Sequence, residues 1–101
     1  MSDLADFLLQ RIAEDEDRAQ GDIEHFGGTA DPRDQWIVKL AHGRLAESAA
    51  KRGIVEAFVE EVPDGKLAFW EDEGRGEALA FACRALASVY AGHPEFREEW
   101  R

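Results

Sequence analysis

Cysteine is almost missing from this sequence. Cys83 is the only cysteine among 101 residues, so one chain cannot form an intramolecular disulfide. A zinc site held by two or more thiolates of one chain is excluded for the same reason. The sequence therefore predicts a fold that rests on an apolar core, and we expect no cofactor.

Long apolar runs are also missing. The N-terminal stretch MSDLADFLLQ has no basic segment ahead of an apolar one, which a secretory signal would have. No stretch approaches the roughly 20 apolar residues that a membrane-spanning helix needs. We therefore expect a cytoplasmic protein without a membrane partner.

Basic residues are outnumbered. Twelve Lys and Arg stand against 22 Asp and Glu, and the formal charge is −10. A nucleic-acid backbone or an anionic membrane would be repelled on average, so direct nucleic-acid binding is disfavoured. The acidity has two interpretations, solubility or recognition of a protein that normally binds polyanions. The basic pair Lys51-Arg52 is expected to pair with Glu47 and Glu56 in its own helix.

The rest of the composition is that of a folded chain. Hydrophobic residues make up 45% of it and three are tryptophan, whereas disordered chains lack the apolar surface that offsets the entropy of ordering. The length suits one domain over residues 1–101. A compact domain of this size would have a radius of gyration of roughly 13 Å.

The first helix is predicted between Ser2 and Gly27-Gly28. Ser2 suits an N-cap, and the acids Asp3 and Asp6 suit the positive end of the helix. The acidic run 14–17 is expected to point outward. The predicted inner face consists of Leu4, Phe7, Leu8, Ile12, Ala19, Ile23 and Phe26.

A long second helix is predicted after it. Asp31 suits the cap and Pro32 the first helical position, and no proline follows until Pro63. The helix would then run for about 30 residues, with Gly43 and Gly53 as places where it can kink or break. Its predicted apolar stripe consists of Ile37, Leu40, Ala41, Leu45, Ala49, Val55 and Val59.

A polar loop at about residues 62–76 separates this helix from a third one, predicted from Glu77 to Ala91 with Gly92 as its cap. Within the loop, VPDGK reads as a turn. KLAFW is expected to be an extended segment that packs Phe69 or Trp70 onto the helices. The third helix would carry Leu79, Cys83, Leu86 and Tyr90 on one stripe.

The C-terminal stretch YAGHPEFREEW concentrates aromatic residues among charges. Pro94 is predicted to open a short terminal helix, with Phe96 and Trp100 four residues apart on one face. One interpretation is a clasp that folds back and buries these rings, and the other is an exposed patch for a partner. The candidate residues for either role are Tyr90, His93, Pro94, Phe96 and Trp100, with Trp36 and Trp70 beside them.

Three segments carry a family resemblance. Phe7-Leu8, Arg11 and the acids 14–16 fit the pattern FLxxRxxEDE, AKRGIVE occupies residues 50–56, and LASVYAGHPEFREEW occupies residues 86–100. The chain resembles a family of small uncharacterised proteins of actinobacteria and their phages. Many relatives are expected to carry further cysteines that suggest a metal knuckle. This chain lacks them, and the resemblance implies no activity.

Catalysis and metal binding find little support. His25, His42 and His93 lie in separate predicted elements, and no nucleophile motif surrounds Cys83. Cys83 on an alanine-rich helix is typical of a small buried apolar residue. No His and carboxylate spacing indicates a metal site.

We therefore predict an all-α fold, a small helical bundle with a long central helix, a third helix and a short C-terminal aromatic helix. The predicted function is that of a non-enzymatic interaction factor, a phage or prophage accessory protein that binds a host protein. Two alternatives stay open, an acidic nucleic-acid mimic and a degenerate metal-binding module. A long apolar stripe on so small a body also favours a symmetric homodimer.

Overall fold

The computed structural model describes residues 2–62 and 73–101, and all its regular elements are helical. They are α1 (Asp3–Phe26), α2 (Pro32–Glu61), α3 (Glu73–Ser88) and the single 3-10 turn η2 (Glu98–Trp100). The predicted all-α class is confirmed. The KLAFW segment and Trp70 lie outside the described residues.

Both long helices begin where side chains cap them. The Ser2 hydroxyl accepts a hydrogen bond from the Ala5 N–H at 3.2 Å, and the Asp31 carboxylate accepts one from the Arg33 N–H at 2.8 Å. These bonds satisfy N–H groups that have no partner inside the helix. Local chemistry thus sets the start of each helix, as the sequence predicts.

Helix α2 is unbroken over 30 residues. Gly43 and Gly53 lie inside it and produce no interruption. Each glycine costs up to about 1 kcal/mol in a helix interior. Continuous packing of α2 along α1 outweighs that cost.

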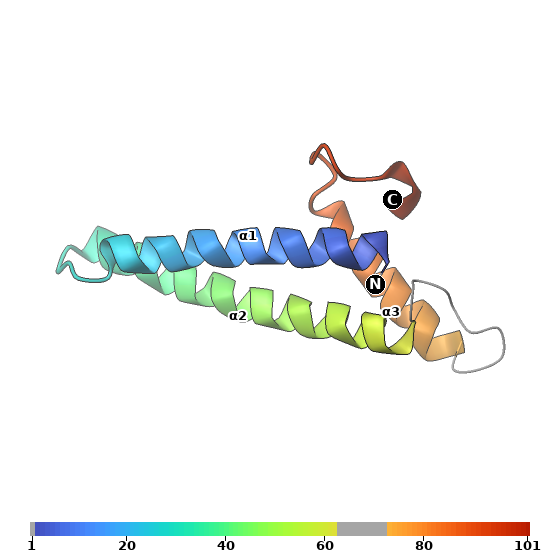
Figure 1. Ribbon diagram of the computed structural model, residues 1–101. Coiled ribbons are helices and arrows are strands. Elements are labelled where there is room, and N and C mark those ends of the chain that lie inside the picture. The colour runs from blue at the N-terminus through green and yellow to red at the C-terminus, as the bar shows by residue number, and fades with distance from the viewer. Residues whose placement is uncertain (1, 63–72) are drawn as a thin grey trace.

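The molecule is elongated because α3 covers only one end of the α1–α2 hairpin (Figure 1). Its extents are 57 × 26 × 17 Å and its radius of gyration is 16.4 Å, well above the roughly 13 Å expected of a compact domain. The main core lies where the three helices meet. It is formed by Leu4, Ala5, Phe7, Leu8, Ile12, Val55, Phe58, Val62, Ala80, Cys83, Ala87 and Trp100.

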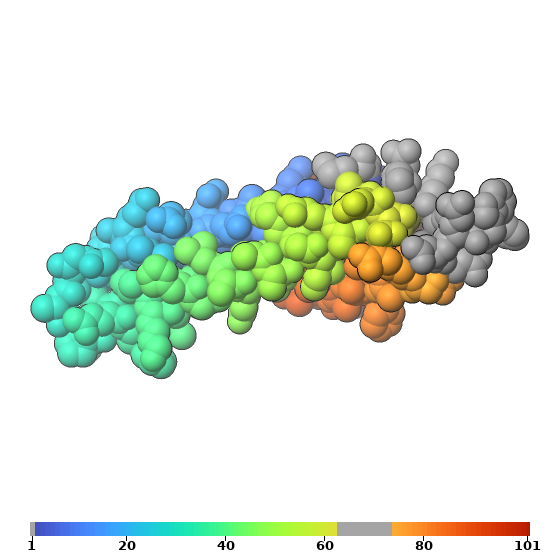
Figure 2. All heavy atoms as spheres, turned by 90° about the horizontal axis from the view of Figure 1, so that it is seen from below, coloured from blue at the N-terminus to red at the C-terminus, as the bar shows by residue number. Residues whose placement is uncertain are grey.

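The other end of the hairpin consists of α1 and α2 alone, and we call residues 17–50 the arm. In Figure 2 the arm is the half of the molecule that carries no orange or red atoms. Its buried residues are Ala19, Ala41 and Ser48. Leu40 and Ala49 of the predicted apolar stripe of α2 are exposed here. With one neighbouring helix, only a narrow seam is covered.

Helix α3 differs from its predicted bounds. It begins at Glu73 and not at Glu77, so the last residues of the predicted loop are helical. It ends at Ser88 and not at Ala91, because the backbone hydrogen bonds after Ser88 no longer follow the α-helical pattern. The Tyr90 N–H donates to the Ala87 carbonyl at 2.9 Å, a bond that spans three residues and not four.

The predicted terminal helix is largely absent. Pro94 lies in a series of turns, in which the His93 N–H donates to the Tyr90 carbonyl at 2.8 Å and the Phe96 N–H donates to the His93 carbonyl at 3.0 Å. Arg97 is extended, with φ −103° and ψ 135°, and only one 3-10 turn follows it. An extended residue between Phe96 and Trp100 cannot belong to a helix.

Candidate functional site

The C-terminal segment, residues 89–101, packs against the first half of α1, and Phe7 is the centre of the contact. The centroid of the Phe7 ring lies 6.2 Å from that of Tyr90, 5.6 Å from His93, 6.2 Å from Phe96 and 5.0 Å from Trp100. Phe7 and Trp100 are buried, and the other three rings are half-buried. We call this contact the clasp.

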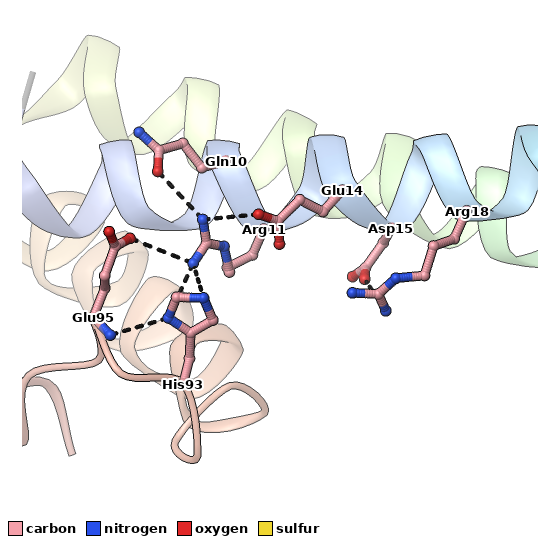
Figure 3. A network of polar contacts seen from close by, with 7 residues as sticks. All are labelled: Gln10, Arg11, Glu14, Asp15, Arg18, His93 and Glu95. Atoms are coloured by element: carbon pink, nitrogen blue, oxygen red, sulfur yellow. Dashed lines mark hydrogen bonds and ion pairs between the residues drawn. The ribbon is translucent and has the colours of Figure 1, made fainter.

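Arg11 lies one helical turn after Phe7, and its side chain is buried, with 5% of the residue exposed. Its guanidinium carbon is 5.2 Å from the centre of the Phe7 ring. One terminal nitrogen, Nη1, donates to His93 Nδ1 at 3.0 Å, contacts His93 Nε2 and reaches Glu95 Oε2 at 3.4 Å (Figure 3). The other, Nη2, lies 3.1 Å from Glu14 Oε1. A buried cation is thus compensated by acceptors from two segments.

His93 acts as an acceptor in this cluster. Its Nδ1 also accepts a hydrogen bond from the Glu95 N–H at 3.0 Å. Arginine can only donate, so a ring nitrogen of His93 must be unprotonated to receive Arg11. His93 therefore joins the C-terminal turns to α1 through its ring nitrogens.

Tyr90 makes the third link of the clasp. Its hydroxyl donates a hydrogen bond to Asp15 Oδ2 at 2.6 Å. Burial, together with this bond to a carboxylate, raises the pKa of Tyr90 well above its ordinary value. Asp15 is also 3.5 Å from Arg18. The Tyr90 side chain is therefore a neutral phenol, and it lies beside the Asp15 carboxylate that pairs with Arg18.

The acidic run 14–17 is not simply turned to solvent, and that prediction needs correction. Asp15 receives Tyr90, and Glu16 forms an ion pair with Arg52 of α2. The predicted pairing of Arg52 with Glu47 or Glu56 is likewise wrong. Arg52 reaches across to α1 because it lies on the side of α2 that faces that helix.

All three segments that carry the family resemblance meet in these contacts. Phe7, Arg11 and Asp15 are spaced by four residues, which places them on one face of α1. That face receives the C-terminal segment, and Glu16 joins α1 to the middle segment through Arg52. The sequence shows that these three residues share a face of α1, but it does not show that the C-terminal segment covers that face.

A cleft of about 500 Å³ opens beside the clasp. Two of its acids are paired within the chain, Asp3 with Arg97 at 2.8 Å and Glu95 with Arg11 at 3.4 Å. The cleft is thus lined by both polar and aromatic side chains. Its lining consists of Asp3, Asp6, Phe7, Gln10, Pro94, Glu95, Phe96, Arg97 and Trp100.

Cys83 and the other two histidines lie apart from this cluster. Cys83 is fully buried in the core, and burial raises the pKa of its thiol from 9.0 to about 11. A protonated thiol is a poor nucleophile and a poor ligand. His25 and His42 are exposed on α1 and α2. Over residues 2–62 and 73–101 no group of three or more His, Cys, Asp and Glu side chains is arranged to hold a metal ion.

Trp36 has different surroundings from the clasp residues. It lies near the start of α2 on the arm and is 58% exposed. The Lys39 ammonium is 5.6 Å from the centre of its ring. Leu40, one turn further along α2, is 45% exposed. A groove of about 330 Å³ lies between α1 and α2, lined by Asp15, Arg18, Arg44, Glu47, Ser48 and Lys51.

The sequence matches a family of unknown function, DUF6221, over residues 1–101. The chain belongs to this family. No curated protein and no solved structure matches it. Family membership therefore covers the clasp, the arm and α3 without assigning a role to any of them. No described helix is long and apolar enough to cross a bilayer.

Proposed function

We propose that the protein is a non-enzymatic interaction factor that binds another protein through the arm. The exposure of Trp36 on a two-helix arm carries this proposal. Tryptophan is the residue type that most often dominates interface energy. Here it lies near the start of α2, and Figure 1 shows that α2 begins at the end of the hairpin that α3 does not cover.

The clasp residues fit this role less well. Trp100 is 7% exposed, and Tyr90, His93 and Phe96 contact α1 or each other. Truncating them would damage the fold before it affected a partner. Of the aromatic candidates within the described residues, Trp36 is the one that is exposed.

The resemblance to proteins of actinobacteria and their phages supports a host protein as the partner, and an accessory role for this chain. Two features support a non-enzymatic role. The thiol of Cys83 is buried in the core, and the half-buried His93 is engaged by Arg11. Neither is arranged beside a base or nucleophile in the way covalent catalysis requires.

Mimicry of a nucleic acid is the competing explanation for the acidity. Its requirement is a row of carboxylates that face a partner. On α1, five acids instead contact arginines of the same chain. These pairs are Asp3–Arg97, Glu14–Arg11, Asp15–Arg18, Glu16–Arg52 and Asp22–Arg44. The arrangement favours recognition by the apolar surface of the arm.

Affinity capture from an actinobacterial lysate tests the proposal. The parent protein, Trp36→Ala and Phe81→Ala are compared at low and high salt, and captured proteins are identified by mass spectrometry. Phe81 is 69% exposed on α3, which makes Phe81→Ala a matched control for loss of an exposed ring. We expect a salt-stable partner that is lost with Trp36→Ala and kept with Phe81→Ala. A salt-labile nucleic-acid-binding protein, captured regardless of Trp36, would favour mimicry instead.

A further inference from the structure

The outward face of α3 carries an apolar stripe that no described element covers. Phe81 and Val89, just beyond the helix end, are each 69% exposed. The residues that share the stripe with them are small, namely Gly74, Ala78, Ala85 and Ser88, and all four are exposed. Together with Phe81, these four residues recur at three- and four-residue spacing, which places them in one line along the helix. The stripe is therefore one large ring with small residues on either side.

The shape of this face suits another helix. A groove of about 390 Å³ runs beside the stripe, between α3 and the end of the chain. Its exposed surface is mainly apolar, unlike that of the cleft beside the clasp and of the groove between α1 and α2. Small residues on both sides of a ring let a second helix approach closely. The groove is lined by Phe81, Arg84, Ala85, Ser88, Trp100 and Arg101.

The charges beside the stripe are self-complementary. Glu77 and Arg84 are exposed and lie seven residues apart, which places them along the same edge of α3. Neither forms an ion pair with another residue of the described ranges. Their midpoint falls next to Phe81. A two-fold axis at that point would bring each glutamate of one chain to the arginine of the other.

We propose that the outward face of α3 binds a second copy of this chain, with the two α3 helices antiparallel and Phe81 beside the two-fold axis. An isologous contact of this kind buries the same surface on both chains. Two Glu77–Arg84 pairs flank it. In the same arrangement the small Gly74 and Ala78 of one chain lie opposite Ala85 and Ser88 of the other.

The local charge makes this face suitable for self-association although the chain carries −10. Helix α3 has two acids, Glu73 and Glu77, and two arginines, Arg75 and Arg84. It is therefore neutral in sum, whereas α1 has eight acids against two arginines. Contact through α3 keeps the acidic helices of the two chains away from the interface.

The size of the stripe sets the strength of the dimer. A 16-residue helix is about 24 Å long. A single pair of such helices falls below the roughly 1,200 Å² of total buried surface that stable complexes reach. We therefore expect a concentration-dependent dimer, with a dissociation constant on the order of micromolar to tens of micromolar.

Sedimentation equilibrium over roughly 1 µM to 1 mM protein tests the proposal. The parent should pass from monomer to dimer, and Phe81→Ala should weaken the dimer at least about tenfold. Trp36→Ala, which removes another exposed ring, on the arm, should leave it unchanged. A parent that stays monomeric over the whole range would overturn the proposal, as would a dimer that depends on Trp36 and not on Phe81.

Charge exchange tests the antiparallel register. Glu77→Arg alone and Arg84→Glu alone each place like charges opposite one another and should weaken the dimer. The double variant Glu77→Arg/Arg84→Glu restores opposite pairs and should recover most of the parent affinity. Both residues are exposed, so circular dichroism should show all three variants folded. Single variants that dimerise like the parent, or a double variant that fails to recover, would contradict the register.

Discussion

The Tyr90 hydroxyl and the Asp15 carboxylate are joined by a hydrogen bond of 2.6 Å that connects residues 75 positions apart. It ties the turn after α3 to the middle of α1. Together with the contacts of Phe7 and Arg11, it fixes the C-terminal segment on a helix that begins at the other end of the sequence. The clasp thus attaches the C-terminal segment to α1 at the end of the molecule where the three helices meet.

Removing this hydrogen bond should lower the stability of the fold. We expect Tyr90→Phe to reduce the free energy of unfolding by about 1 to 2 kcal/mol, because the bond is charge-assisted but the ring itself is retained. Urea unfolding followed by circular dichroism measures the change. Asp15→Asn and the double variant complete a cycle. If the two single effects simply add, the residues are not coupled and the bond contributes nothing specific.

Truncating the buried indole of the clasp should have a larger effect. Trp100 is 7% exposed and contacts Phe7 and Phe96. Trp100→Ala is expected to destabilise the fold by about 3 to 5 kcal/mol, which is a large part of the stability of a domain of this size. Trp36→Ala, which removes an exposed indole, should change the melting temperature little. Similar melts for Trp100→Ala and the parent would show that the clasp does not stabilise the fold.

Much of the fold follows from local signals. Ser2, Asp31 and Pro32 predict where α1 and α2 begin, because capping depends only on neighbouring residues. The sequence does not predict whether α2 continues through Gly43 or breaks there. The free-energy cost of a glycine in a helix is small, and the packing of α2 against α1 that offsets it is a tertiary contact.

The clasp and the exposed rings are harder to predict. Periodicity shows which residues share a helix face, but not whether a neighbouring element covers that face. Leu40 belongs to the apolar period of α2 and is exposed because α3 lies at the other end of the hairpin. Arg11 gives the opposite case, a charged residue that is buried because the C-terminal segment brings His93 and Glu95 to it.

Burial of Cys83 predicts a loss of stability in alkali. The unfolded chain loses the thiol proton near pH 9.0, whereas the folded chain keeps it to about pH 11. Between these values the unfolded state binds fewer protons, so the free energy of unfolding falls as the pH rises. The total is about 3 kcal/mol for the two pKa units. The full contribution is present below pH 9.0 and is lost by about pH 11.

Urea unfolding at several values between pH 8 and pH 11 measures this effect. Tyr90 also has a raised pKa, so its ionisation adds to the loss in both proteins. Cys83→Ala is the control, because it lacks the thiol and retains Tyr90. Its stability should fall less steeply with pH than that of the parent. Parallel curves would mean that the thiol does not contribute.

The glycines of α2 should be sites of stabilisation. Apart from its chain neighbours and the adjacent backbone of α2 itself, a Cβ built at Gly43 or at Gly53 would meet no atom within 4 Å. Alanine there restricts the unfolded chain and suits the helix, so Gly53→Ala should raise the free energy of unfolding by about 0.5 to 1 kcal/mol. Gly43→Ala should do the same, and the two changes should add because the sites are ten residues apart and share no contact.

Gly27 provides the matched control for these substitutions. It follows the last residue of α1, and a Cβ there would collide with the backbone carbonyl of Ile23. Because a backbone atom cannot move aside as a side chain can, Gly27→Ala should destabilise the protein while Gly43→Ala and Gly53→Ala stabilise it. Thermal melts of the three variants beside the parent measure the contrast. A lower melting temperature for Gly53→Ala would indicate that α2 is bent or interrupted there in solution, since an uninterrupted helix favours alanine.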